Sequence, residues 1–206
     1  MIIKKANAKA ISYACKNFHY AKCVPAVSYG YNIYNDNNEW CGVICFGSGA
    51  TPNLVKQFDL LQGEVYELER VALNGKQEFT SKAVVMALKQ LHKDNPLVKL
   101  VVSFADNRQH HIGTIYQATN WIYLGKVILS NCKEYLLNGK WIHPRTMTTF
   151  KNKKELKATL PRRSVSDKFK YVFVFDKRLR KKYQKMALPY PKDKDLTLND
   201  SETSKP

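Results

Sequence analysis

A nearly continuous run of apolar residues, Leu97–Phe104, places the strongest constraint on how this chain folds. A run of that length is typical of a strand covered on both faces, as in a sheet with helices on either side. The neighbouring segments also show the patterns of strands and helices. Val65–Leu73 alternates like a strand, Thr80–His92 has apolar residues at helical spacing, and Trp121–Leu129 is again strand-like. Strands that alternate with helices in this way predict an α/β fold.

Weaker patterns extend this core in both directions. They predict a helix at 8–20, a hairpin of 26–34 with 39–46, a short helix at 109–119, a hairpin of 135–137 with 140–143, a helix at 151–160, a strand at 170–175 and a basic helix at 178–184. We expect a single domain over residues 1–188, with a basic part at about 140–188. The proline-rich and polar residues 189–206 predict a disordered tail.

The sequence shows no segment that would take the chain into or across a membrane. No apolar run approaches the roughly 20 residues needed to span a bilayer, and nothing resembles a signal peptide. The cysteines are odd in number and form no CxxC pair; they are Cys15, Cys23, Cys41, Cys45 and Cys132. We therefore expect a soluble cytoplasmic protein with reduced, mostly buried thiols, and the alternative is a structural metal held by some of them.

The positive charge of the chain is concentrated near its C-terminus. Residues 140–192 contain 17 Lys and Arg against three acidic residues, so +14 of the net charge of +17 lies there. A local basic region on an ordinary body is typical of a polyanion binder, because neutralised phosphates release condensed counterions. Nucleic acid is the leading partner; a solubilising surface or an anionic membrane contact is the alternative.

Several residues after the apolar run carry polar chemistry. Asp106 follows the strand directly, where ligands bind in open α/β sheets, or it caps the next helix. Tyr116 lies ten residues later, and the alternative for it is a buried tyrosine with a satisfied hydroxyl. The pair His110-His111 is a candidate for substrate contact or capping rather than metal ligation, because adjacent helical side chains diverge.

A second candidate site lies between the strand that ends near Arg70 and the helix that begins near Thr80. A strand that leads through a loop to a helix N-terminus forms an anion site, through free backbone amides and the helix dipole. The loop contains neither a Walker motif nor a dinucleotide fingerprint, so a nucleoside triphosphate or nicotinamide cofactor is disfavoured.

Ordered blocks of residues resemble the Mom family of phage proteins. They are Tyr29-Gly30-Tyr31 leading to Gly42-Val43 and Phe46-Gly47, then Glu67-Leu68-Glu69-Arg70-Val71, Ser81, Val102–Asp106, His111–Trp121 and Tyr123-Leu124-Gly125, with a weak extension at His143-Pro144-Arg145. The resemblance covers about residues 27–145, and its most specific part is Ser103–Gly125. It departs from the family at Phe104, where a tyrosine is common, and in lacking a clean glycine-rich pyrophosphate loop.

This resemblance implies a fold like that of the GNAT acyltransferases, with a mixed central sheet flanked by helices and a basic C-terminal extension. It implies acetyl-CoA or a related acyl-CoA as cofactor, contacted by Arg70, Val71 and Ser81. Asp106 and Tyr116 match the catalytic positions. The implied function is modification of the exocyclic amine of adenine in double-stranded DNA, which protects phage DNA from restriction in the bacterial host.

The chemistry of that reaction suggests a role for each of several residues. The adenine amine is a poor nucleophile, so a base must take its proton, which suits Asp106, while Tyr116 suits the departing thiolate. An adenine in a duplex must be flipped out of the stack. Candidate base and DNA contacts are Tyr29, Tyr31, His110, His111, Asn120, Trp121, Arg162, Arg163, Arg178, Arg180, Lys181 and Lys182.

Two other functions remain open from sequence. One is a GNAT acetyltransferase that acts on a protein or RNA amine, and the other is a DNA-binding protein that keeps the fold without the chemistry. The transferred group, the DNA sequence context and any metal requirement are not fixed by these residues.

Overall fold

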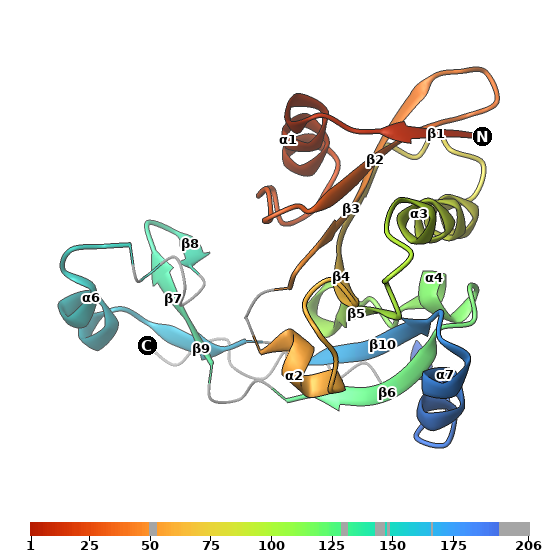
Figure 1. Ribbon diagram of the computed structural model, residues 1–206. Helices are drawn as coiled ribbons and strands as arrows, with labels where there is room; N and C mark the ends of the chain where they lie inside the picture. The colour runs from red at the N-terminus through yellow and green to blue at the C-terminus, as the bar shows by residue number, and fades with distance from the viewer. Residues whose placement is uncertain (50–52, 129–131, 143–146, 148, 166, 194–206) are drawn as a thin grey trace. The chain divides into compact units, whose positions relative to one another are not determined.

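The computed structural model describes residues 1–49, 53–128, 132–142, 147, 149–165 and 167–193 (Figure 1). The chain divides into two compact units. Unit one contains Met1–Phe104, Gly113–Leu124 and Lys170–Tyr190. Unit two contains Ala105–Ile112, Gly125–Phe169 and the described residues from Pro191 onward.

A seven-stranded mixed sheet forms the framework of unit one, in the order β1-β2-β3-β4-β5-β10-β6. Its strands are β1 (Ile2–Lys5), β2 (Tyr29–Tyr34), β3 (Trp40–Gly47), β4 (Val65–Leu73), β5 (Leu100–Asp106), β6 (Ile122–Val127) and β10 (Lys168–Val174). Strands β1 to β4 pair antiparallel, whereas β4 and β5 pair parallel. The late strand β10 lies between β5 and β6, so the C-terminal part of the chain completes the sheet.

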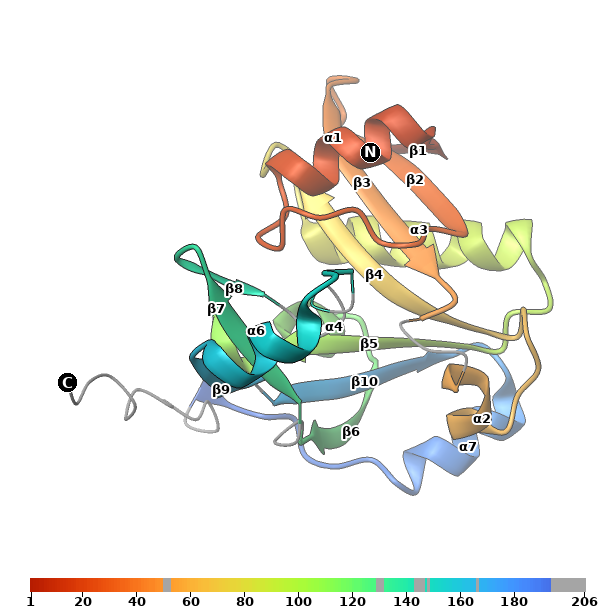
Figure 2. The same ribbon diagram turned by 90° about the vertical axis from the view of Figure 1, so that its left-hand side faces the viewer.

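Helices cover both faces of the sheet. They are α1 (Ala8–Asn17), α2 (Leu54–Phe58), α3 (Thr80–Asp94), α4 (Thr114–Gln117) and α7 (Lys177–Gln184). At the β2–β4 half, α1 and α3 lie on opposite faces (Figures 1 and 2). Because strand side chains alternate, Val43 and Cys45 pack against α1, while Phe46 meets Tyr31 on the other face. Elsewhere α2 and α7 pack on a cluster that includes Val102 and Val172.

Unit two contains a small antiparallel sheet in the order β8-β7-β9. Its strands are β7 (Lys133–Leu137), β8 (Lys140–Ile142) and β9 (Arg162–Ser164), and a helix α6 (Lys153–Thr159) precedes β9. The predicted Asn138-Gly139 turn joins β7 and β8, and both residues have positive φ, 50° and 73°. A 3-10 turn, η1 (Asn107–Gln109), also belongs to unit two.

The predicted helix at 109–119 is wrong. His110 has φ of 53° and Gly113 has φ of 82°, so the backbone turns left-handed twice and helical geometry is kept only in η1 and in α4. The sequence patterns also missed β1, α2 and β9. Each has five residues or fewer, which is too short for a period to be seen.

The structure also bears on the expected tail and membrane status. Residues 189–193 are placed, and Tyr190 donates a hydrogen bond from its hydroxyl to the Trp121 carbonyl at 2.6 Å, so the tail predicted from Pro189 does not begin there. Residues 194–206 lie outside the described part of the chain. Among the described residues, no helix has the length and apolarity to cross a bilayer.

Candidate functional site

Strands β4 and β5 part from each other in the middle of the sheet. They pair only from Val65 with Leu100 to Glu67 with Val102, although β4 continues to Leu73 along β3 (Figure 2). The β3–β4 register shifts at this point, where Leu68 and Arg70 face consecutive residues of β3 and Glu69 is extra. Such a bulge increases local twist and turns β4 away from β5. Beyond Glu67, the edge of β4 therefore has no backbone pairing with β5.

Two hydroxyl groups meet where the strands part. The Ser103 Oγ on β5 lies 3.1 Å from the Leu68 carbonyl oxygen of β4 and 2.8 Å from the Tyr116 hydroxyl oxygen. Ser103 has one proton, so it donates either to Leu68, while accepting from Tyr116, or to Tyr116 itself. In the second arrangement the proton of Tyr116 is directed elsewhere. Ser103 had no role in the sequence prediction, although a serine inside a buried apolar run was an available signal.

Tyr116 is buried and fixed in position. Burial raises the pKa of its hydroxyl to about 12, against a smaller lowering by the Ser103 hydrogen bond. Its ring packs on Trp121 and Tyr171, with centroids 5.0 and 5.1 Å away, and its backbone N–H donates to the Gly113 carbonyl at 2.8 Å. The hydroxyl thus stays protonated at physiological pH, and the ring that carries it is held in one position.

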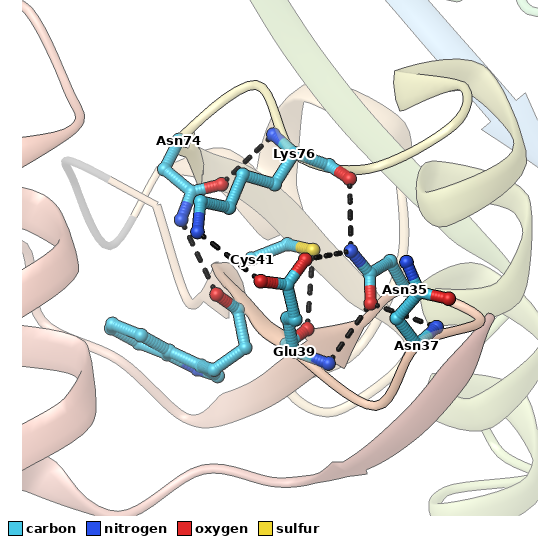
Figure 3. A network of polar contacts seen from close by, with 7 residues as sticks. Asn35, Asn37, Glu39, Cys41, Asn74 and Lys76 are labelled. Carbon is cyan, nitrogen blue, oxygen red and sulfur yellow. Dashed lines mark hydrogen bonds and ion pairs between the residues drawn. The ribbon is translucent and has the colours of Figure 1, made fainter.

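The loop between β4 and α3 is tied to the β2–β3 turn (Figure 3). The Asn35 amide donates to the Lys76 carbonyl at 3.2 Å and to the Glu39 carboxylate at 2.8 Å, and Lys76 forms an ion pair with Glu39 at 3.3 Å. The Asn74 amide donates to the Trp40 carbonyl at 3.2 Å. These contacts hold the segment that presents the N-terminus of α3.

The N-terminus of α3 has the properties of an anion site. The N-cap residue Phe79 makes no side-chain capping bond, so no cap competes for the first amides of the helix at Thr80 and Ser81. No acidic residue lies in the first turn, and the helix is 15 residues long, so its dipole favours an anion here.

Arg70 faces the side of the sheet that α1 covers, whereas the neighbouring Val71 faces the other side. The Arg70 guanidinium donates to the Glu69 carbonyl at 2.6 Å and to the Cys23 Sγ at 3.3 Å. Its Nε is buried and has no hydrogen-bond partner among the described residues. A spare buried donor fits an anionic ligand, but the predicted cofactor residues Arg70 and Val71 do not share one face.

The positive charge of Arg70 acts on the pKa values of two buried cysteines, Cys15 and Cys45. Cys15 and Cys45 are buried neighbours between α1 and β3. A hydrogen bond from Cys45 lowers the pKa of the Cys15 thiol to about 7, with a further lowering by Arg70, while the pKa of Cys45 is raised. Cys41 is also buried, and Cys23 is exposed. In the part of the chain that the structure describes, no three His, Cys, Asp or Glu side chains are arranged to hold a metal.

Two of the predicted base-stacking residues belong to the core. Tyr31 and Trp121 are fully buried, and the Tyr31 hydroxyl donates to the Asp94 carboxylate at 3.1 Å. Neither ring is exposed in this structure, and base stacking by these two residues stays a prediction. Tyr29 is half-buried and lies edge-on to Tyr66 at 5.4 Å, so its ring stays a candidate.

Asp106 and the histidine pair lie in unit two. The Asp106 carboxylate accepts a hydrogen bond from the Arg108 backbone N–H at 3.0 Å, which is the capping role weighed against catalysis. This bond uses Oδ1 and leaves catalysis by Asp106 a prediction. His110 and His111 are exposed. Asn120, in unit one, is also exposed and adopts φ of 58°.

The predicted DNA-contacting arginines differ in how they are held. In unit two, Arg163 pairs with Glu134 at 2.9 Å and stacks on Trp141 at 4.1 Å, so its charge is already partnered, and Arg162 is exposed. Arg108 shares Glu134 at 2.6 Å. In unit one, Arg178, Lys181 and Lys182 are exposed, and Arg180 is half-buried. Arg163 therefore has a structural role that its sequence context did not reveal.

We expect Glu134→Gln to loosen the small sheet of unit two. The change leaves Arg108 and Arg163 close together without their shared counter-charge, at a cost of about 1–2 kcal/mol for these partly exposed side chains. Hydrogen exchange at the amides of β7 and β9 measures this cost. Glu155→Gln, an exposed acid on α6, is the control; equal exchange in the two variants would contradict the assigned role.

Comparison with known proteins supports this description of the fold. The solved structure of spermidine/spermine N-acetyltransferase SpeG from Vibrio cholerae matches with a TM-score of 0.51 at 7% identity, covering 87% of this chain and 95% of that one. A second structure of that enzyme also gives 0.51, at 8% identity, covering 88% and 99%. The predicted GNAT-like α/β fold is thereby confirmed.

Sequence comparison identifies the family. The chain is 29% identical over 187 residues to the methylcarbamoylase Mom of Escherichia phage Mu, covering 84% of this chain and 76% of that protein. The model of the Mom protein family matches residues 1–192, so this chain belongs to the Mom family.

Proposed function

We propose that this chain is a transferase that moves a group carried by an acyl-CoA onto the exocyclic amine of adenine in DNA. The observation that carries the proposal is the divergence of β4 from β5 with the Ser103–Tyr116 hydroxyl pair at its origin. The family membership and the name of the phage Mu relative support group transfer of the methylcarbamoyl kind. Acetyl-CoA is the simplest donor to test first.

The donor would bind where β4 and β5 stop pairing. The backbone edge of β4 beyond Glu67 has N–H and C=O groups that β5 does not pair, and these could bond the amides of a pantetheine arm, as an added strand does. The amides at Ser81 and the dipole of α3 suit the pyrophosphate, whereas the spare Nε of Arg70 lies on the opposite side of the sheet, under α1. When bound, the donor supplies a thioester carbonyl, from which a thiolate can leave.

In the proposed reaction, Asp106 and Tyr116 have different roles in handling protons. A base must accept the proton of the adenine amine as the new C–N bond forms and the C–S bond breaks, and Asp106 has that role in our proposal. An ordinary thiol has a pKa near 8.5 and Tyr116 one of about 12, so complete proton transfer from Tyr116 to the thiolate is uphill by about 5 kcal/mol. Tyr116 therefore acts as a hydrogen-bond donor to the developing negative charge, which refines the proton-donor role predicted from sequence.

The orientation of the Ser103 hydroxyl determines whether Tyr116 can donate a hydrogen bond to the ligand. While Ser103 donates to the Leu68 carbonyl, Tyr116 donates to Ser103. When Ser103 turns to donate to Tyr116, the phenolic proton is free for the ligand. Ser103 is thus a positioning residue for Tyr116.

The test is the mass of the nucleosides in DNA that is co-expressed with the protein. We expect a new adenine nucleoside whose added mass identifies the transferred group. Unmodified DNA together with a modified lysine peptide or transfer RNA would instead support the acetyltransferase alternative. Salt-dependent DNA binding without any thioester turnover would support the non-enzymatic one.

A further inference from the structure

The helix α7 has three different faces. Leu179 and Tyr183 pack into the core of unit one, and Arg180, Gln184 and the following Ala187 line a surface pocket. A third face contains four exposed cations: Arg178, Lys181, Lys182 and Lys185. These four residues, spaced at i, i+3, i+4 and i+7, are called here the α7 cation stripe.

The α7 cation stripe lacks acidic partners. None of its members forms an ion pair within the described part of the chain, and α7 has no acidic residue after its N-cap, Asp176. From Arg178 to Lys185 the helix rises about 10 Å, and the long side chains at its two ends extend this reach to about three phosphates of one DNA strand. The stripe therefore matches a run of phosphates in charge and length.

The pocket beside the stripe has a volume of about 420 Å³. It is lined by Asn120–Tyr123, Arg180, Gln184 and Ala187–Tyr190. One wall is fixed, because Leu188 donates from its backbone N–H to the Tyr123 carbonyl at 3.0 Å and Tyr190 donates to the Trp121 carbonyl at 2.6 Å. The pocket thus lies along the edge strand β6 and is a built feature of unit one.

The chemistry of the pocket suits a nucleotide. Arg180 supplies a cation without an ion pair in the described residues, Asn120 and Gln184 supply amides, and the half-exposed Tyr190 supplies an aromatic face. A phosphate on Arg180 with a base or sugar against the amides and the tyrosine would use these groups together.

We propose that the α7 cation stripe and this pocket together bind a DNA strand, with phosphates along the stripe and one nucleotide in the pocket. The inference rests on the proposed function for its choice of DNA. A bilayer fits α7 less well, because its apolar residues Leu179 and Tyr183 are turned into the core and leave it no apolar face. The sequence already named Arg178, Arg180, Lys181 and Lys182 as candidate DNA contacts; the structure adds Lys185 to the stripe and places Arg180 in the neighbouring pocket instead.

The test compares two variants that lose the same charge. One replaces Arg178, Lys181, Lys182 and Lys185 with glutamine; the control replaces Lys151, Lys153, Lys154 and Lys157 of the α6 region with glutamine. Binding to a fluorescent DNA duplex is measured from 50 to 200 mM salt without donor. For about three lost phosphate contacts we expect the slope of log affinity against log salt to become shallower by about 2.7 in the α7 variant. Across this salt range the wild-type protein then loses about 40-fold more affinity than the variant, and the control keeps the wild-type slope.

A single change tests the pocket. Arg180→Gln is expected to weaken DNA binding while changing the slope by only about one unit. Equal losses in the α7 and α6 variants, or no loss in either, would overturn the proposal. So would α7-dependent binding to anionic vesicles with none to DNA. Because the assay contains no donor, DNA without modified adenine would refute the proposed function and leave this inference standing.

Discussion

Tyr116→Phe is expected to lower the yield of modified adenine about 100-fold or more while the protein remains folded. The loss follows from removing a preorganised donor to the charge that develops on the leaving group. The fold tolerates the change because Ser103 can still donate to the Leu68 carbonyl, so no buried group is left without a partner. The measurements are nucleoside mass spectrometry of co-expressed DNA and thermal unfolding of the variant.

Two further variants make this prediction specific. Tyr183→Phe removes a hydroxyl from another buried tyrosine, on α7, and should leave the yield unchanged. Ser103→Ala leaves the Tyr116 hydroxyl buried without its partner, so it should cost about 1–3 kcal/mol of stability and also reduce the yield. Because the pKa of Tyr116 is about 12, its ionisation should not affect the rate between pH 7 and pH 10. If the Tyr116→Phe variant gives modified adenine at the wild-type yield, Tyr116 has no catalytic role.

Gly113→Ala is expected to destabilise unit one strongly. A Cβ at this position would lie 2.5 Å from Tyr171 Cε2 and 2.9 Å from Tyr116 Cδ2, inside a packed aromatic cluster. Overpacking costs about 1–3 kcal/mol, and the φ of 82° adds about 1–2 kcal/mol for a residue with a side chain. At about 2–4 °C per kcal/mol for a chain of this size, the melting temperature should fall by about 4–20 °C.

Gly63→Ala separates the two causes of that loss. Gly63 has φ of 91°, close to that of Gly113, but a Cβ there has nothing within 4 Å. It therefore carries the backbone cost without the clash, and its melting temperature should fall by about 2–8 °C. Equal melting temperatures in the two variants would show that the aromatic cluster gives way to the added methyl group.

Local patterns in the sequence predicted the strands and helices that are long enough to show a period. Val65–Leu73 was predicted with the bounds that β4 has, because its alternation stops at the turn residues Asn74-Gly75. The strand at 170–175 was also expected, but its place between β5 and β6 was not, because pairing between distant strands leaves no local pattern. The left-handed turns at His110 and Gly113 were missed because a helical pattern of side chains does not report φ.

The candidate site was predictable in its parts but not in its geometry. Tyr116 was singled out from sequence, yet its hydroxyl meets Ser103 only because the chain reverses twice over the intervening residues. The burial of Tyr31 and Trp121 could not be read from residue type, since aromatic side chains serve both cores and nucleic-acid surfaces. Likewise, an arginine paired as Arg163 is with Glu134 looks the same in sequence as a free one.

The hydrogen bonds that Asn35 donates to the Lys76 carbonyl and Asn74 to the Trp40 carbonyl hold the loop before α3, and they bear on the thermodynamics of anion binding. A loop that becomes ordered only when it binds an anion loses conformational entropy, at roughly 1–2 kcal/mol per residue fixed. Here the Lys76 carbonyl and the Asn74 side chain are already held by the β2–β3 turn. For an anion at the N-terminus of α3, this part of the loop therefore adds little ordering cost to binding.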